Sequence, residues 1–148
     1  MLIRPATRAD VPAIVALLVD DEIGATREQP DDLAPYLAAF ERVDADPSEV
    51  LVVADVDGAV VGTLQLTIIP GLSRVGATRA QIEGVRVGSG QRGSGLGAQL
   101  IQWAIDEARA RGALIVQLTS DLKRVDAHRF YERLGFEATH AGYKLNLR

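Results

Sequence analysis

A glycine-rich stretch with one fixed cation is the part of the sequence best suited to hold a ligand. It runs from Gly88 to Gly97, reads GSGQRGSGLG and carries Arg92 near its centre. A strand-like apolar pattern precedes it and a helical pattern follows it. First-turn N–H groups of a helix lack intrahelical partners and lie at the positive end of its dipole, and glycine lets the backbone approach a ligand closely. The stretch therefore predicts a phosphate or pyrophosphate site.

Two known patterns fit this stretch. Gly88, Gly90 and Gly93 match G-x-G-x-x-G, the dinucleotide fingerprint, and Asp121 ends the next expected strand, where a ribose-binding acid could lie. The dinucleotide pattern has two difficulties. The segment after Asp121 is too short for the rest of a doubly wound sheet, and a cation such as Arg92 is unusual in a dinucleotide-binding turn. The other pattern is R-x-x-G-x-G over Arg92–Gly97, and the rest of the chain decides between the two.

Composition narrows the class of protein. The 148 residues have the apolar content of an ordinary globular protein, and we expect a single domain over residues 1–148. The formal net charge of −4 argues against an electrostatic nucleic-acid binder. The absence of cysteine excludes disulfides and thiolate nucleophiles and fits a cytoplasmic protein. We expect no secretory signal, no membrane span and no metal site.

The hydrophobic pattern predicts an α/β protein with a mixed sheet. Expected strands are 2–4, 50–56, 60–69, 80–87, 114–119, 136–140 and 143–147. Expected helices begin near residues 7–10, 31–32, 98 and 120–121, and Asp57-Gly58 is the clearest hairpin turn. The predicted order is β-α-α-β-β-β-α-β-α-β-β.

Acidic residues stand out at two places in this plan. Strand alternation places Glu83 on one face with Val85 and Val87, and a carboxylate on an apolar face is costly to bury. The acidic run 20–22 ends the first helix, where it opposes the helix dipole. This run is either a solvated helix end or an acidic rim that attracts a cationic amine.

A second motif decides between the two patterns. Residues 127–136 read AHRFYERLGF, which resembles the A-x-x-F-Y-x-x-x-G-F block of the GNAT superfamily of N-acetyltransferases. Residues 92–97 resemble the acetyl-CoA pyrophosphate loop of the same family, and the order of elements is similar over nearly the whole chain. The resemblance implies the GNAT-like fold, a central mixed sheet flanked by about four helices, with acetyl-CoA as acetyl donor and no metal.

The resemblance also implies a binding mode for acetyl-CoA. The cofactor would lie between the strand before the loop and the strand after its helix, with the pantetheine amides on backbone groups of the first. The implied contact residues are Val85, Arg86, Val87, Arg92, Gly93, Ser94, Gly95, Leu96, Gly97, Ser120 and Arg124. Two positions depart from the family pattern, because Ser89 replaces a frequent proline and Arg124 a frequent asparagine. Arg124 either reaches a CoA phosphate or faces solvent.

Acetyl transfer to an amine requires a base for the amine and benefits from an acid for the departing thiolate. Glu83 is the candidate base and Tyr131, the motif tyrosine, is the candidate acid. Their alternatives are a structural carboxylate paired with an arginine and a core tyrosine. His128 is expected on the surface and His140 near the acceptor pocket.

The predicted function is acetyl transfer from acetyl-CoA to a primary amine of a small molecule. The alternatives are acetylation of a protein lysine or N-terminus and, in another class, a CoA-binding regulator without catalysis. We expect no nucleic-acid or membrane partner, and the family resemblance allows a homodimer.

Overall fold

The computed structural model describes all 148 residues and divides the chain into two compact units, Met1–Gln117 and Leu118–Arg148. The helices and strands are β1 (Leu2–Pro5), α1 (Val11–Val19), α2 (Ala34–Ala45), β2 (Glu49–Val56), β3 (Ala59–Ile69), α3 (Ser73–Gly76), β4 (Arg79–Val87), α4 (Leu96–Ala110), β5 (Ile115–Leu118) and α5 (Val125–Arg133). Single 3₁₀ turns lie at Arg8–Asp10, Gly24–Thr26 and Ser89–Gln91.

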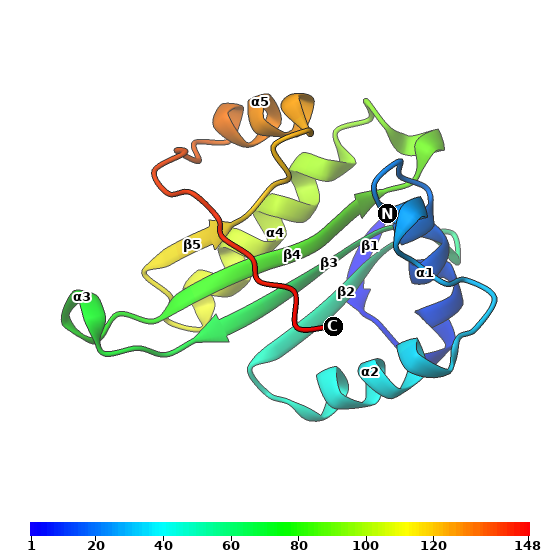
Figure 1. Ribbon diagram of the computed structural model, residues 1–148, viewed down its shortest axis with the longest axis horizontal. Coiled ribbons are helices and arrows are strands. Elements are labelled where there is room, and N and C mark those ends of the chain that lie inside the picture. The colour runs from blue at the N-terminus through cyan, green and yellow to red at the C-terminus, as the bar shows by residue number, and fades with distance from the viewer. The chain divides into compact units, whose positions relative to one another are not determined.

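The strands form one mixed sheet in the order β1-β2-β3-β4-β5. The first four are antiparallel, and β5 lies beside β4 and runs in the same direction (Figure 1). Asp57 and Gly58 both have positive φ, which suits a tight hairpin between β2 and β3. The predicted α/β class, the mixed sheet and this hairpin are confirmed.

Helices cover both faces of the sheet in the first unit. Leu64 on β3 and Leu100 on α4 are fully buried, and a Cβ on Gly62 would come within 3.1 Å of Leu100. Glycine at position 62 therefore lets α4 pack closely against β3. The opposite face carries α1 and α2, where Ile14 and Phe40 pack with Val53 of β2. Figure 1 shows α4 behind the sheet and α1 in front of it.

The two strands expected at 136–140 and 143–147 are wrong. Residues 134–148 contain no helix or strand, and Tyr143, Leu145 and Leu147 are almost fully exposed. Apolar alternation predicts a strand only where a neighbouring strand and a covered face reward it, and an isolated pair of short strands is marginal in water. Each helix is too short or too polar to span a membrane.

Candidate active site

The glycine-rich loop has the conformation that its sequence predicts. Ser89–Gln91 form a 3₁₀ turn, and Gly93 and Gly95 have φ angles of 81° and 86°. Residues other than glycine rarely adopt these angles, so glycine is strongly favoured at both positions. Gly95 is the N-cap of α4, so the loop leads directly into the start of a 15-residue helix.

The start of α4 has the donors that a pyrophosphate group needs. The N–H groups of Gly97 and Ala98 have no acceptor in the chain, as expected for the first turn of a helix. A Cβ on Gly93 or Gly95 would meet nothing within 4 Å, so the backbone is open on that side. Residues 92–97 therefore fit an anionic group.

The end of α1 holds the loop through Asp20. The Asp20 carboxylate accepts a hydrogen bond from the Ser89 N–H at 3.1 Å and lies 3.8 Å from the Arg92 guanidinium. That guanidinium also donates to the Asp20 carbonyl oxygen at 2.6 Å. One member of the acidic run thus binds the loop. An anion bound there would compete with Asp20 for the Ser89 N–H and the Arg92 guanidinium.

Arg86 and Asp21 form a second link between β4 and α1. Arg86 Nη2 lies 3.9 Å from Asp21 Oδ2, and both side chains are largely buried. Asp21 also accepts the Gly24 N–H at 2.8 Å, and Arg86 Nη1 donates to the Val85 carbonyl at 2.8 Å. Arg86 is therefore part of the framework beside the loop as well as an implied cofactor contact.

The end of β4 presents backbone groups at its outer edge. The Gly88 N–H donates to the Val61 carbonyl of β3. Because backbone groups alternate between the two edges of a strand, those of Val85 and Val87 face away from β3. Contact between β4 and the segment that enters β5 lies at the start of β4, where the Leu114 N–H donates to the Thr78 carbonyl. This edge fits the expected pairing with the pantetheine amides.

A β-bulge at Gly84 overturns the predicted face of Glu83. Glu83 pairs with Gln65 of β3, whereas Arg86 pairs with Thr63, so the β4 side has one extra residue. Gly84 takes a φ of 62° at this point. Glu83 therefore shares its face with Arg86 and not with Val87, which pairs with Gly62 on the α4 side.

Glu83 is also exposed, contrary to the expected burial. Its side chain makes no hydrogen bond or ion pair with the chain, so the alternative of a carboxylate paired with an arginine is not what the structure contains. Around it, polar side chains occupy the same face. Gln65 and Thr67 both donate to the Glu49 carboxylate, at 2.8 and 2.9 Å, and Gln117 donates to Gln81 at 2.7 Å.

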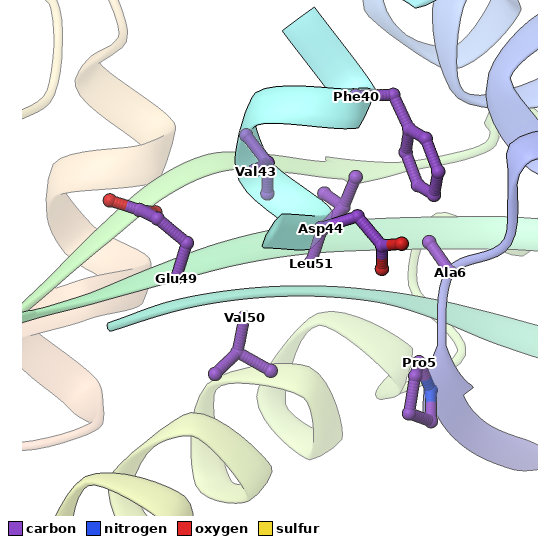
Figure 2. Close-up of a pocket in the computed structure, with 8 residues that line it drawn as sticks. All are labelled: Pro5, Ala6, Phe40, Val43, Asp44, Glu49, Val50 and Leu51. Atoms are coloured by element: carbon purple, nitrogen blue, oxygen red, sulfur yellow. The ribbon is translucent and has the colours of Figure 1, made fainter. Parts of the chain in front are cut away.

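Two hollows lie on the α1 and α2 side of the sheet. One, of about 150 Å³, is mostly apolar and is lined by residues that include Ile14, Phe40, Gln65 and Gly84. The other, of about 90 Å³, lies between α2 and the β1 and β2 strands (Figure 2). Ordinary ligand sites enclose about 300–1,000 Å³. Both hollows are smaller than this range. Only the first is lined by Gln65, which pairs with Glu83 across the strands, and its size suits a short carbon chain.

The second unit contains Tyr131 on α5. Its ring makes edge contacts with Phe130 at 5.2 Å and Phe136 at 5.9 Å between centroids. Helix α5 ends at Arg133, and Gly135, just after the C-cap residue Leu134, has a φ of 95°, which explains the glycine of the motif. The Tyr131 ring is thus fixed by its own motif.

Other candidate residues of the second unit differ in their surroundings. The Ser120 hydroxyl is buried without a hydrogen-bond partner, which fits its assignment as a ligand contact. Arg124 is the N-cap residue of α5. His128 Nε2 bonds the Asp121 carbonyl at 2.8 Å, and His140 is exposed beside Thr139.

Comparisons with known proteins agree with the loop and the fold. The model of the acetyltransferase (GNAT) family matches residues 12–136. A curated aminoalkylphosphonate N-acetyltransferase from Salmonella typhimurium is 32% identical, with 93% of this chain and 86% of the relative covered. A Pseudomonas aeruginosa L-methionine sulfoximine/L-methionine sulfone acetyltransferase is 34% identical, covering 91% of this chain and 79% of the relative.

A solved structure also matches closely. It is described as a transcriptional regulator from Bacillus halodurans and is 44% identical, with a TM-score of 0.96 and 99% of each chain covered. The chain belongs to the GNAT family of acetyltransferases. It is an N-acetyltransferase, and the family uses acetyl-CoA as its acetyl donor, which confirms the family, fold and enzyme class predicted from the two motifs.

Sequence reasoning missed Asp20 as a partner of the loop and missed Glu49 and Gln65 entirely. A signal was present in β3, where Thr63, Gln65 and Thr67 alternate with two leucines. Alternation of this kind in a central strand indicates that one face of the strand is polar. A polar face that helices would otherwise cover is a candidate ligand-binding site.

Proposed function

We propose that the protein transfers the acetyl group of acetyl-CoA to the primary amine of a small molecule. The observation that carries the proposal is the pairing of an open anion-binding loop at the start of α4 with an exposed carboxylate, Glu83, on the strand that leads into it. Acetyl-CoA supplies an activated thioester. The free N–H groups at the start of α4, those of Gly97 and Ala98, and the Arg92 guanidinium are the groups that would hold its pyrophosphate.

Glu83 is the proposed general base. An alkylammonium must lose a proton before its nitrogen can attack, and general base catalysis of this kind contributes about 10²–10⁴-fold. The carboxylate is accessible and makes no competing contact with the chain, so it is available to take the proton directly or through one water. Tyr131 is the proposed acid for the thiolate, supported by its place in the family motif.

The relatives favour a small acceptor. Their names specify an aminoalkylphosphonate and an amino-acid analogue, both of which are small molecules with a primary amine. The mostly apolar hollow beside Gln65 would take the short carbon chain of such a molecule. Acetylation of a protein lysine or N-terminus remains the alternative acceptor class.

The Bacillus halodurans structure is described as a transcriptional regulator, which favours a regulatory role as the second candidate; in this chain that role would be CoA binding without catalysis. One experiment separates the candidates. The purified protein is incubated with acetyl-CoA and a panel of aminoalkylphosphonates, amino acids and short peptides, while free CoA thiol is followed. Release with the small amines supports the proposal, release with peptides alone supports protein acetylation, and acetyl-CoA binding without release supports a regulator.

A further inference from the structure

Two acceptor groups lie side by side on the face of the sheet where Glu83 is exposed. Gln65 and Glu83 are direct cross-strand partners on β3 and β4, and side chains of such pairs lie about 4.5–5.5 Å apart at Cβ. Both belong to the face that carries α1 and α2, because Gln65 lines the hollow formed with Ile14 and Phe40. Gly84, the neighbour of Glu83, lines the same hollow, so a ligand group at this point can contact both side chains.

Glu49 fixes the orientation of the Gln65 amide. Gln65 Nε2 donates to Glu49 Oε2 at 2.8 Å, and Thr67 Oγ1 donates to the same oxygen at 2.9 Å. An ionised carboxylate only accepts hydrogen bonds, so the NH₂ group of Gln65 must face Glu49. Figure 2 shows the Glu49 carboxylate directed away from Phe40 and Ala6. The Gln65 carbonyl oxygen is therefore presented away from Glu49 as a fixed acceptor.

The gap between Gln65 and Glu83 lacks a donor. Within residues 1–117, no group donates to Gln65 Oε1 or to the Glu83 carboxylate. These two acceptors, the Gln65 oxygen held in place by the bond to Glu49 and the charged Glu83 carboxylate, match a ligand group with several N–H donors and a positive charge. A primary ammonium has three N–H donors and a full charge, whereas a hydroxyl has one donor and no charge.

We infer that Gln65 and Glu83 together bind the ammonium group of the acceptor, and that Glu49 is a positioning residue that holds the Gln65 amide for this task. The inference rests on the proposed function and adds to it a specificity determinant on β3. It gives a role to Gln65, the central one of the polar residues 63, 65 and 67 on this face of β3. The apolar hollow beside Gln65 receives the rest of the acceptor.

The test uses the full chain with 2-aminoethylphosphonate as acceptor and steady-state CoA release as readout. Gln65→Leu removes the carbonyl acceptor, and with it a hydrogen bond to a charged group, which is stronger than one between neutral groups. The KM for the amine should rise about 10-fold or more, while the KM for acetyl-CoA and the kcat at saturating amine change less than about 3-fold.

Glu49→Gln tests the positioning role. A glutamine at position 49 can donate as well as accept, so the Gln65 amide loses its single orientation, and the KM for the amine should rise about 3- to 10-fold. In the Gln65→Leu background the same substitution should have no further effect on this KM, because Glu49 acts through Gln65. A merely structural role would give additive losses in both proteins.

Gln81→Leu is the matched control, because it makes the same change on the same face of the sheet, in a residue bonded to Gln117. It should leave the KM for the amine unchanged. An active wild type with an unchanged amine KM in Gln65→Leu would overturn this inference alone. A wild type that releases no CoA with any amine would overturn the proposed function and the inference with it.

Discussion

Glu83 is the side chain on which the proposed proton transfer depends. Glu83→Gln keeps the shape but cannot accept the amine proton, so kcat/KM should fall about 100-fold at pH 7. The loss should shrink as the pH approaches the pKa of a free alkylamine, about 10, because the unprotonated amine then becomes abundant. pH–rate profiles for the two proteins measure this effect.

The exposure of Glu83 makes the result easy to interpret. A carboxylate without partners in the chain contributes little to folding, so the melting temperature should not change. Glu41→Gln, the same substitution at an exposed ion pair on α2, serves as the control and should leave activity intact. Parallel pH–rate profiles for wild type and Glu83→Gln would remove Glu83 from the mechanism.

Tyr131 is tested by removal of its hydroxyl group alone. Tyr131→Phe keeps the edge contacts of the ring with Phe130 and Phe136. If the hydroxyl protonates the thiolate, kcat should fall roughly 10- to 100-fold while acetyl-CoA affinity by calorimetry stays within a few fold. Tyr143→Phe, at an exposed position, should have no effect. Full activity in Tyr131→Phe would assign the residue to packing.

The contact between the end of α1 and the glycine-rich loop predicts a competition. The Asp20 carboxylate accepts the Ser89 N–H and lies beside Arg92, both of which are groups that a pyrophosphate would use. Asp20→Asn removes the competing charge but keeps an acceptor for Ser89. Acetyl-CoA affinity should therefore rise, by about 2- to 5-fold at low salt, and the gain should fade at high salt because both side chains are partly exposed.

Two further substitutions bracket this experiment. Asp106→Asn makes the same charge change on the exposed face of α4 and should leave affinity unchanged. Gly95→Glu places a carboxylate at the helix N-cap and at a φ of 86°, and it should abolish acetyl-CoA binding. Weaker binding by Asp20→Asn would show that Asp20 shapes the loop rather than competing with the ligand.

Local signals made much of the fold predictable from the sequence. The Asp57-Gly58 turn, the strand that ends at Val87 and the helix after Gly95 each depend on residues within a few positions of one another. The loop conformation follows from two glycines with positive φ. These features are confirmed because no distant contact has to override them.

Features that depend on pairing between strands could not be predicted from the sequence. The bulge at Gly84 adds one residue to β4 and so reverses the face expected for Glu83 relative to Val87. Strand alternation counts residues but cannot see an irregular register. The link between Glu49 and Gln65 has the same origin, because it joins side chains of different strands. Such sites become visible only when the sheet is assembled.

A charged cluster of Arg4, Asp10 and Asp55 stabilises the first unit where the edge strand β1 joins the sheet. Arg4 of β1 donates to both oxygens of Asp10, at 2.8 and 3.0 Å, and to Asp55 of β2 at 3.0 Å. The Thr7 N–H and hydroxyl also donate to Asp10. The hydrogen bonds from Arg4 in particular lower the pKa of the Asp10 carboxyl from its ordinary 3.8 to about 2.

This depressed pKa predicts how the fold responds to acid. A carboxyl whose pKa is lower in the folded state stabilises that state above its unfolded pKa and loses the contribution as the pH falls from about 4 to about 2. Asp10→Asn should therefore lower the free energy of unfolding by about 2 kcal/mol at pH 7, since each pKa unit corresponds to about 1.4 kcal/mol. Urea unfolding at several pH values should show this difference shrinking toward pH 2, whereas the exposed Asp106→Asn should show no difference at any pH. A deficit for Asp10→Asn that is as large at pH 2 as at pH 7 would mean that Asp10 stabilises the fold by packing and neutral hydrogen bonds, and not by its charge.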